Sequence, residues 1–233
     1  MNVLVIDIGG SHVKLFATGA AQSRRFESSD ALTAQDLIDR VRAETADWEY
    51  DVISVGFPGL IAAGAPAAEP GNLGDGWVGF DFAEAFDRPV RVVNDAVMQA
   101  LGAYDGGRML FLGLGTGLGS ALVTEHVVIP LELGSLPSPR GATMAERVGR
   151  DALKHNGRDR WVRDVHDVTV VLGDALVAEY IVLGGGNAKF VDPLPLRTRR
   201  GGNEDAFTGG FRLWEEVVEP HTREPHRVWR VVQ

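Results

Sequence analysis

The chain has 233 residues, no cysteine and a formal net charge of -9 at pH 7. The absence of thiols excludes disulfides, thiolate catalysis and cysteine-ligated zinc, and the acidic balance argues against non-specific nucleic-acid binding. No apolar run reaches the roughly 18 residues of a membrane-spanning helix. Strand-like sequence begins at Asn2 without a secretory signal pattern. We therefore expect a cytoplasmic protein without a nucleic-acid or membrane partner.

The first half of the chain alternates between strand and helix patterns. Leu37, Ile38 and Val41 recur at helical spacing after Thr33, which is a plausible N-cap. The predicted strands are 2–8, 11–18, 51–57 and 90–93, the predicted helices are 33–46 and a helix from Asn94-Asp95 to about Tyr104, and 62–76 is a predicted loop.

The second half begins with a near-repeat of the opening arrangement, since residues 108–125 again read as strand, glycine turn and strand. The later expectations are a helix over 158–177, a strand over 179–183, a helix over 204–216 and a tail over 217–233 with a final strand at 227–232. This alternation predicts the α/β class, and the repeated unit predicts two related lobes with a cleft between them. We expect an N-terminal lobe over 1–105 and a C-terminal lobe over 106–233, whose last segment can pack back on the first lobe.

Four glycine turns follow apolar strands, at Gly9-Gly10, Pro58-Gly59, 115–117 and 184–186. Glycine lets backbone N–H groups approach a ligand closely, and phosphate oxygens suit such turns. A single turn of this kind is equally typical of a tight hairpin. The segment 115–119 is the strongest case, because the Thr116 hydroxyl and the amides around it can hold a terminal phosphate. It matches neither a P-loop nor a dinucleotide-binding fingerprint.

Three polar residues stand at strand ends. Asn94 and Asp95 precede a helix, so they either cap it or bind a substrate, with Asp95 accepting a proton from a hydroxyl. An Asp beside a helix N-terminus is expected to stay ionised and to be a weak base, which phosphoryl transfer tolerates. Asp7 either caps its turn or holds Mg²⁺ through water.

The motifs together resemble one family. The segments VIDIGGSHVK (5–14), GFPG (56–59), NLGDGWVG (72–79), VVNDA (92–96), LGLGTGLG (112–119), ELGS (132–135) and IVLGGG (181–186) occur in the order found in ROK sugar kinases. These kinases lie within the hexokinase–actin-like ATPase superfamily, and the likeness is closest to the polyphosphate glucokinases.

The resemblance implies a two-lobed actin-like ATPase (ribonuclease H-like) fold, with mixed sheets flanked by helices and a cleft between the lobes. It also implies transfer of a terminal phosphoryl group from ATP or inorganic polyphosphate to the 6-hydroxyl of a glucose-like hexose, with Mg²⁺, in a homodimer. No zinc is expected.

The resemblance also implies residue roles. Asp95 is the catalytic base and Asp7 holds the water shell of Mg²⁺. The sugar-side residues are Asn94, Glu132, Ser135, Asn72 and Gly59. The residues expected around the donor phosphates or nucleotide are Asp7, Gly9, Gly10, Ser11, Lys14, Gly115, Thr116, Gly117, Gly184, Gly185 and Gly186.

Some residues depart from the family pattern or have two readings. Ser135 stands where the family carries a histidine, which puts the choice of sugar in question. His12 either touches a phosphate or points to solvent, and Trp77 either stacks on a sugar or braces its loop. The basic clusters at 158–163 and 197–200 are either solvated surface or a track for polyphosphate.

Two other functions compete with the kinase. One is a non-catalytic or weakly active sugar-binding regulator, which Ser135 favours. The other is a different enzyme of the superfamily, acting on a carboxylate. The pair Asn94-Asp95 and Glu132 favour a polyol over a carboxylate, which calls for a cationic partner.

Overall fold

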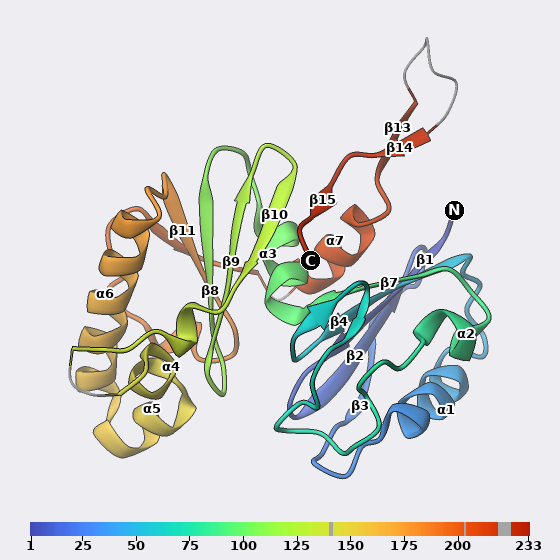
Figure 1. Ribbon diagram of the computed structural model, residues 1–233, viewed down its shortest axis with the longest axis horizontal. Helices are drawn as coiled ribbons and strands as arrows, with labels where there is room; N and C mark the ends of the chain where they lie inside the picture. Colours follow the sequence, from blue (N-terminus) through green and yellow to red (C-terminus); the bar gives the residue numbers. More distant parts are fainter. Residues whose placement is uncertain (140–141, 203, 219–224) are drawn as a thin grey trace.

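The computed structural model describes residues 1–139, 142–202, 204–218 and 225–233. Two sheets stand side by side with the helices α3 and α7 between them (Figure 1). The predicted α/β class with mixed sheets and flanking helices is confirmed. Where one lobe ends and the next begins in the sequence stays a prediction.

The first sheet has the order β3-β2-β1-β4-β7. Its strands are β1 (Val3–Ile8), β2 (His12–Ala17), β3 (Arg24–Glu27), β4 (Val52–Phe57) and β7 (Val90–Asn94). β1 pairs antiparallel with β2 and parallel with β4, and β4 pairs parallel with β7. Asp7, Phe57 and Asn94 therefore stand at or near the carboxyl ends of three parallel neighbours.

Helices α1 (Ala34–Glu44) and α2 (Phe82–Phe86) pack on this sheet. Thr33 is the N-cap of α1, as predicted: its side chain accepts from Asp36 N–H, and the Asp36 carboxylate accepts from Thr33 N–H. This capping box satisfies two N–H groups that the first turn leaves unpaired. The buried face of the helix carries Leu37, Ile38 and Val41.

The second sheet has the order β12-β11-β8-β9-β10-β15. Its strands are β8 (Met109–Leu114), β9 (Leu118–Thr124), β10 (Val127–Leu131), β11 (Tyr180–Gly184), β12 (Thr198–Arg200) and β15 (Arg230–Val231). Helices α4 (Met144–Val148), α5 (Arg150–Asn156) and α6 (Arg158–Ala175) lie on its outer side (Figure 1). The small elements are β5 (Ile61–Ala62), β6 (Ala65–Pro66), β13 (Glu216–Val218), β14 (Pro225–Arg227), and the 3₁₀ turns Leu133–Ser135 and Ala188–Phe190.

Helices α3 (Asp95–Ala103) and α7 (Asp205–Arg212) cross between the sheets. The crossing is so close that a Cβ at Gly102 would collide with the Asp205 carbonyl, and a Cβ at Gly209 would collide with the Met98 carbonyl. Side chains from both sheets and both helices share one core here, including Val5, Phe111 and Phe207. The two sheets are thus joined through α3, the helix that begins at Asp95.

The predicted elements match the observed ones except where the pattern was short. The helix expected over 204–216 ends at Arg212, and the loop over 62–76 begins within a small β5–β6 hairpin. β3, β5, β6, β10, β12, β13, β14, α2, α4 and α5 were not predicted, and of the final strand expected over 227–232 the structure has β15 (Arg230–Val231). Most of these segments carry too few residues to show a period. Part of the predicted tail, 219–224, lies outside the described residues.

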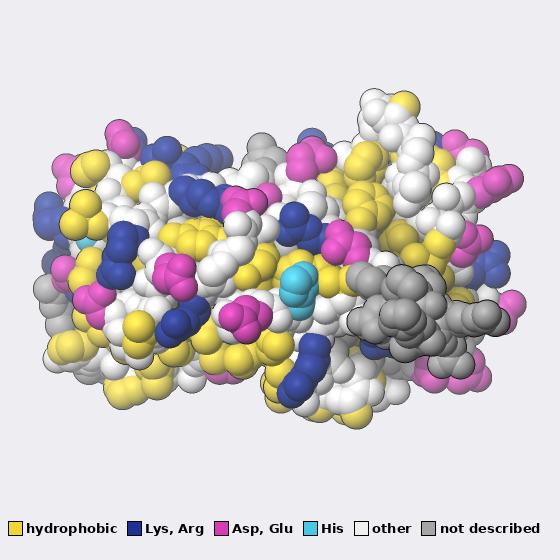
Figure 2. All heavy atoms as spheres, turned by 90° about the horizontal axis from the view of Figure 1, so that it is seen from above, with side chains coloured by type: hydrophobic (Ala, Val, Ile, Leu, Met, Phe, Trp, Pro, Cys, Tyr) yellow, Lys and Arg dark blue, Asp and Glu magenta, His cyan; other side chains and the backbone are white. Residues whose placement is uncertain are grey.

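Side chains of both charges are interspersed across the face seen from above (Figure 2). Among the described residues, no helix is both long and apolar enough to cross a lipid bilayer.

Candidate active site

Two cavities meet at Asp95. The Asn94 cavity, of about 550 Å³, is lined by glycine turns of both sheets, which contribute Gly10 and Thr116, and by Asn94 and Glu132. The Lys14 cavity, of about 530 Å³, is lined by Asp7, Lys14, the turn 184–186 and several basic side chains. Both cavities are lined by Gly9, Asp95, Gln99, Gly185 and Gly186.

The strand arrangement explains why these residues meet. The carboxyl ends of β1, β4 and β7 lie at one edge of the first sheet, and ligands of open α/β sheets bind at that edge. The β8–β9 turn and the end of β11 bring the second sheet's glycines to the same cavities. Segments separated by more than a hundred residues therefore share one cleft.

Asp95 has a strongly altered acidity. Burial raises its pKa to about 7, and the negative charges of Asp7 and Glu132 act in the same direction. The Ala96 N–H donates to Asp95 Oδ1 at 2.8 Å and lowers the pKa, but it does not outweigh burial. The expectation of a fully ionised, weak base was wrong, because burial between two sheets outweighs the helix N-terminus.

Asn94 caps helix α3, as one of its two readings predicted. Its Oδ1 accepts from Ala96 N–H at 2.9 Å, and its Nδ2 donates to the Gly59 carbonyl at 3.0 Å. Asn94 also lines the Asn94 cavity. A hydrogen bond from Asn94 to a substrate hydroxyl stays a proposal, and it would use the same amide atoms that cap α3 and bind the Gly59 carbonyl.

Asp7 is buried beside Lys14. Lys14 Nζ lies 3.3 Å from Asp7 Oδ2, and the Asp7 side chain is 7% exposed against 48% for Lys14. Burial raises the pKa of Asp7, while the Lys14 charge and hydrogen bond oppose that rise. Asp7 and Asp95 both face the Lys14 cavity.

These two carboxylates fit a hydrated magnesium ion. Carboxylate oxygen is the ligand type that Mg²⁺ takes, in small number, while it keeps much of its water shell. The negative charge of Asp7 raises the pKa of Asp95, and a divalent cation, if bound near these carboxylates, would offset that repulsion. Within the described residues, no group of three or more His, Asp and Glu side chains is placed to ligate a metal directly.

The residues predicted around the donor phosphates reach the cleft with one exception. The turns at Gly9-Gly10 and 115–117 line the Asn94 cavity, while Lys14 and 184–186 line the Lys14 cavity. Ser11 lines neither cavity, and its carbonyl accepts from Ser28 N–H at 3.1 Å. His12 also lines neither cavity, which favours the interpretation that its side chain points to solvent over a contact with phosphate.

The residues predicted to bind the sugar also reach the cleft with one exception. Gly59, Asn72 and Glu132 line the Asn94 cavity, but Ser135 does not. Ser135 is exposed, and its Oγ donates to the Glu132 carbonyl at 2.7 Å. The structure therefore places Ser135 behind Glu132 and away from the cavity wall.

Trp77 braces its loop, as one of its two readings predicted. Its side chain is fully buried against Phe57 and Phe82, with ring centroids 5.4 and 6.4 Å away. The Glu69 carboxylate accepts from the Gly76 and Trp77 N–H groups at 3.2 and 3.1 Å. This loop continues from Asn72, so the brace fixes part of the cavity wall.

Several cavity residues were not predicted. Gln99 lies one helical turn after Asp95 and lines both cavities, and the i,i+4 spacing on α3 could have revealed it. Arg150 lines the Asn94 cavity. Arg24, Arg25, Lys189 and Arg200 line the Lys14 cavity, and no local pattern in the sequence brings these four together.

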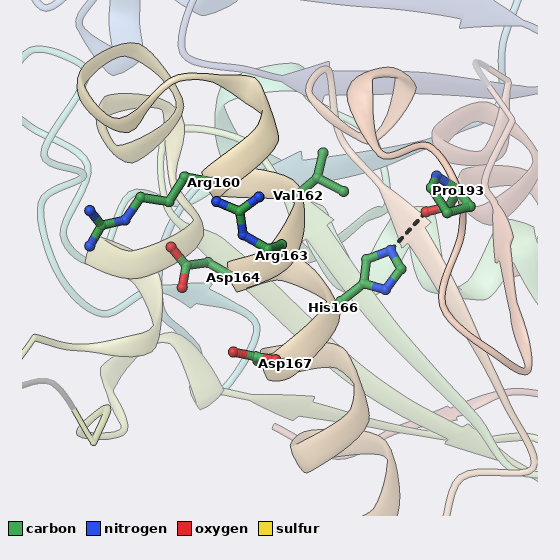
Figure 3. Close-up of a pocket in the computed structure, with 7 residues that line it drawn as sticks. All are labelled: Arg160, Val162, Arg163, Asp164, His166, Asp167 and Pro193. Carbon is green, nitrogen blue, oxygen red and sulfur yellow. Dashed lines mark hydrogen bonds between the residues drawn. The ribbon is translucent and has the colours of Figure 1, made fainter.

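The basic cluster at 158–163 lies elsewhere. Arg160 and Arg163 project from α6 into a separate hollow with Asp164, His166 and Asp167 (Figure 3). In the 197–200 cluster, Arg197 pairs with Asp174 and Arg199 with Asp105, each at 2.7 Å. Of the two clusters, only Arg200 lines a cavity of the cleft.

The architecture is that of the two-lobed actin-like ATPase fold. It closely matches an inorganic polyphosphate/ATP-glucomannokinase from Arthrobacter sp. strain KM, with a TM-score of 0.76, 24% identity, and coverage of 89% of this chain and 96% of that one. A ROK family glucokinase from Streptomyces griseus has a TM-score of 0.72 at 12% identity, with coverage of 90% and 97%. At these identities the matches bear on the fold alone, and they confirm the predicted fold.

Curated relatives agree with the structural matches. A polyphosphate glucokinase from Mycobacterium leprae is 28% identical over 165 residues, which cover 64% of this chain and half of that protein. A polyphosphate glucokinase from Mycobacterium tuberculosis is 26% identical over 220 residues, covering 84% and 82%. No model of a known protein family matches the chain. The predicted resemblance to ROK sugar kinases and polyphosphate glucokinases is confirmed by these relatives.

Proposed function

We propose that this protein is a sugar kinase that transfers a terminal phosphoryl group from ATP or inorganic polyphosphate to the 6-hydroxyl of a hexose. The observation that carries the proposal is Asp95, a carboxylate at the junction of two cavities with its pKa raised to about 7. A general base works best when its pKa lies near the operating pH. One cavity can then hold the acceptor and the other the donor.

The acceptor is a polyol in the Asn94 cavity. Asn72, Glu132 and the Gly59 segment offer hydrogen-bonding groups on its wall, and Asp95 accepts the proton of the reacting hydroxyl as the bond to phosphorus forms. Phosphoryl transfer passes through a loose transition state, so positioning and charge neutralisation supply most of the catalysis. A glucose-like hexose is the acceptor that the relatives support.

The donor is a polyanion in the Lys14 cavity. The cations that line it are Lys14, Arg24, Arg25, Lys189 and Arg200, in a chain of net charge -9. Arg24 is held by Asp47 at 2.5 Å, whereas Arg25 and Lys189 are exposed. The glycine turns at 9–10 and 115–117 lie where the donor meets the acceptor, and the turn 184–186 can back a nucleotide.

Magnesium belongs to this proposal. Asp7 and Asp95 are the residues that would face it, and when bound it would neutralise charge on the donor phosphates. Lys14 Nζ, 3.3 Å from Asp7 Oδ2, opposes the rise that burial causes in the pKa of Asp7 and holds the carboxylate at the cavity. A homodimer and a cytoplasmic location stay predictions.

The decisive experiment is a panel of sugars assayed with ATP and with polyphosphate, with and without Mg²⁺, in the natural chain and in Asp95→Asn. The amide keeps an oxygen that accepts from Ala96 N–H but cannot take a proton, so we expect phosphorylation to fall by about a thousandfold with donor binding retained. Wild-type turnover in Asp95→Asn would sink the assignment of the base. Phosphorylation of no sugar would favour the sugar-binding regulator.

The donor can be tested separately with Arg25→Gln/Lys189→Gln. If polyphosphate lies along these cations, its KM rises by about tenfold, since two charge contacts are lost. The matched control is Arg160→Gln/Arg163→Gln, which removes the same charge from the hollow of Figure 3. Equal KM values in the two variants would contradict this path for the donor.

A further inference from the structure

A third cavity lies where the edge strands of the two sheets come together. It has a volume of about 440 Å³ and is lined by β7 of the first sheet and by β15 of the second. We call it the Arg91 cavity. We propose that it binds a small phosphorylated anion, with Arg91, Arg227 and Arg230 supplying the positive charge.

The three arginines are not held in ion pairs by the described carboxylates. Within the described part of the chain, none of them forms an ion pair with a carboxylate. By contrast, Arg24, Arg147, Arg197, Arg199 and Arg200 are all paired with aspartates. Three unpaired guanidinium groups on one cavity of an acidic protein mark a place that a soluble anion can occupy.

Arg91 is the inner member of the group. Its guanidinium lies 3.7 Å from the centre of the Trp214 ring, and one of its nitrogens donates to the Leu213 carbonyl. Its Nε is buried and has no hydrogen-bond partner among the described residues. The ring and the carbonyl fix the guanidinium in place, so little conformational entropy is lost when an anion binds.

The positive charge around Arg91 affects its pKa. The pKa of Arg91 is lowered to about 10, chiefly by burial and also by the charge of Arg227, while Glu216 opposes both. Glu216 stands opposite Arg227 in the β13–β14 pairing, yet its charge does not offset burial and Arg227. A bound anion would relieve this repulsion between arginines.

The cavity walls indicate the kind of anion. Guanidinium groups bind phosphate oxygens through paired N–H donors, and several of them suit a dianion better than a single carboxylate. Val90, Val93 and Val231 supply apolar surface beside the charges, and a volume of this size accepts a small molecule. The two sources that share this chemistry are inorganic phosphate and a hexose phosphate.

The Arg91 cavity is separate from the cleft but close to it. A smaller cavity of about 30 Å³ shares Val93, Val231 and Gln233 with it, and shares Asn94 and Glu132 with the Asn94 cavity. Gln233 Nε2 also donates to the Val92 carbonyl at 2.9 Å, tying the end of the chain to β7. An anion bound here contacts both sheets behind the proposed acceptor site.

The hollow of Figure 3 supplies the matched control. It also carries two arginines, Arg160 and Arg163, but acidic Asp164 and Asp167 share its wall. Removing two arginines from either place changes the net charge equally. Only the change at the Arg91 cavity is expected to remove a phosphate site.

The test is a calorimetric titration of the full chain with inorganic phosphate at constant ionic strength, without sugar or donor. The variants are Arg227→Gln/Arg230→Gln and Arg160→Gln/Arg163→Gln. Both arginines of the first variant are exposed, and thermal melts check that each variant folds. Because the proposed cleft also binds phosphate, the quantity compared is the number of phosphate sites and the affinity of each.

We expect the natural chain and the control to bind phosphate at the same sites with the same affinities. In Arg227→Gln/Arg230→Gln, one of these sites should bind phosphate about tenfold more weakly or be lost, because two charge-assisted contacts are removed. Glucose 6-phosphate in place of phosphate distinguishes the sources: tighter binding than phosphate identifies a phosphate ester, and weaker binding identifies free phosphate. Identical titrations of all three proteins would overturn the proposal. The result does not depend on kinase activity, since no transfer occurs in the titration.

Discussion

The β1–β2 hairpin and the β8–β9 hairpin have the same strand pairing, but the first carries charged side chains where the second carries glycines. β1 pairs antiparallel with β2 and parallel with β4, and β8 pairs in the same way with β9 and β11. At equivalent positions, Asp7 stands between Lys14 and Gly56 in the first sheet. Gly113 stands between Gly119 and Gly184 in the second.

The difference shows how one local fold serves two tasks. The first hairpin presents a buried carboxylate and a cation to the Lys14 cavity, so it can handle a hydrated metal and donor charge. The second presents backbone and the exposed Thr116 to the Asn94 cavity, so it can approach an uncharged or phosphorylated substrate closely. The strand pairing fixes where each turn lies, and the side chains decide what it binds.

Among changes within the two hairpins, the largest effect is expected in the charged β1–β2 hairpin. Asp7→Asn removes a carboxylate that faces the donor cavity, and we expect phosphoryl transfer to fall by about a hundredfold because metal and phosphate charge lose a partner. Lys14 is half-exposed, so the fold should survive its unpairing. Steady-state kinetics over a range of Mg²⁺ concentrations measure the loss. Unchanged activity would mean that the two hairpins do not differ in function.

The pH profile gives the next effect. Asp95 must be ionised to accept a proton, so kcat/KM should rise about tenfold per pH unit and level off above its pKa of about 7. Because the charge of Asp7 raises the pKa of Asp95, the residual activity of Asp7→Asn should level off at lower pH. A profile that does not move would show that the two carboxylates do not interact.

The same raised pKa affects stability. The folded protein holds a proton on Asp95 that the unfolded chain releases between the ordinary value of 3.8 and about 7. The free energy of unfolding should therefore fall as pH rises through this window. Asp95→Asn should remove that fall and stabilise the protein at pH 8 by on the order of 4 kcal/mol. Denaturant titrations of the natural chain and of Asp95→Asn at pH 5 and pH 8 measure the free energies of unfolding. An equal change in that free energy between pH 5 and pH 8 in the two proteins would contradict this account.

A smaller effect compares the two glycine turns directly. A Cβ at Gly10 would lie 2.5 Å from Asn72 Nδ2, whereas a Cβ at Gly115 would meet nothing within 4 Å. Gly10→Ala should displace Asn72 and raise the KM for the sugar by about fivefold. Gly115→Ala adds the same methyl without displacing any side chain, so its effect on that KM should be smaller. Equal changes in both would show that Asn72 does not contact the acceptor.

The smallest effect concerns Thr116. Its hydroxyl is exposed on the wall of the Asn94 cavity, where it can donate one neutral hydrogen bond to a phosphate. Thr116→Val should raise the KM for the donor by about threefold with kcat little changed, because one such bond contributes about 1 kcal/mol or less. A loss as large as that of Asp7→Asn would assign the second hairpin a catalytic role.

The sequence by itself determined the local elements and the points where they turn. Apolar runs ended by glycine predicted β1, β4, β8 and β11, and Thr33 predicted the start of α1, because strand period, turn residues and caps act within a few residues. The order of the motifs led to the fold of the ROK sugar kinases. The residues Asp7, Asn94 and Asp95 were visible as polar groups at strand ends.

Only the tertiary structure decided how those groups behave. The raised pKa of Asp95 arises from burial and from Asp7 and Glu132, which lie on other segments. The cations of the Lys14 cavity come together from β2, β3 and the 188–200 region, and Ser135 turns its hydroxyl to the Glu132 carbonyl. Solvent exclusion and charge interactions depend on distances across the whole fold, and these distances are set when the two sheets pack around α3 and α7.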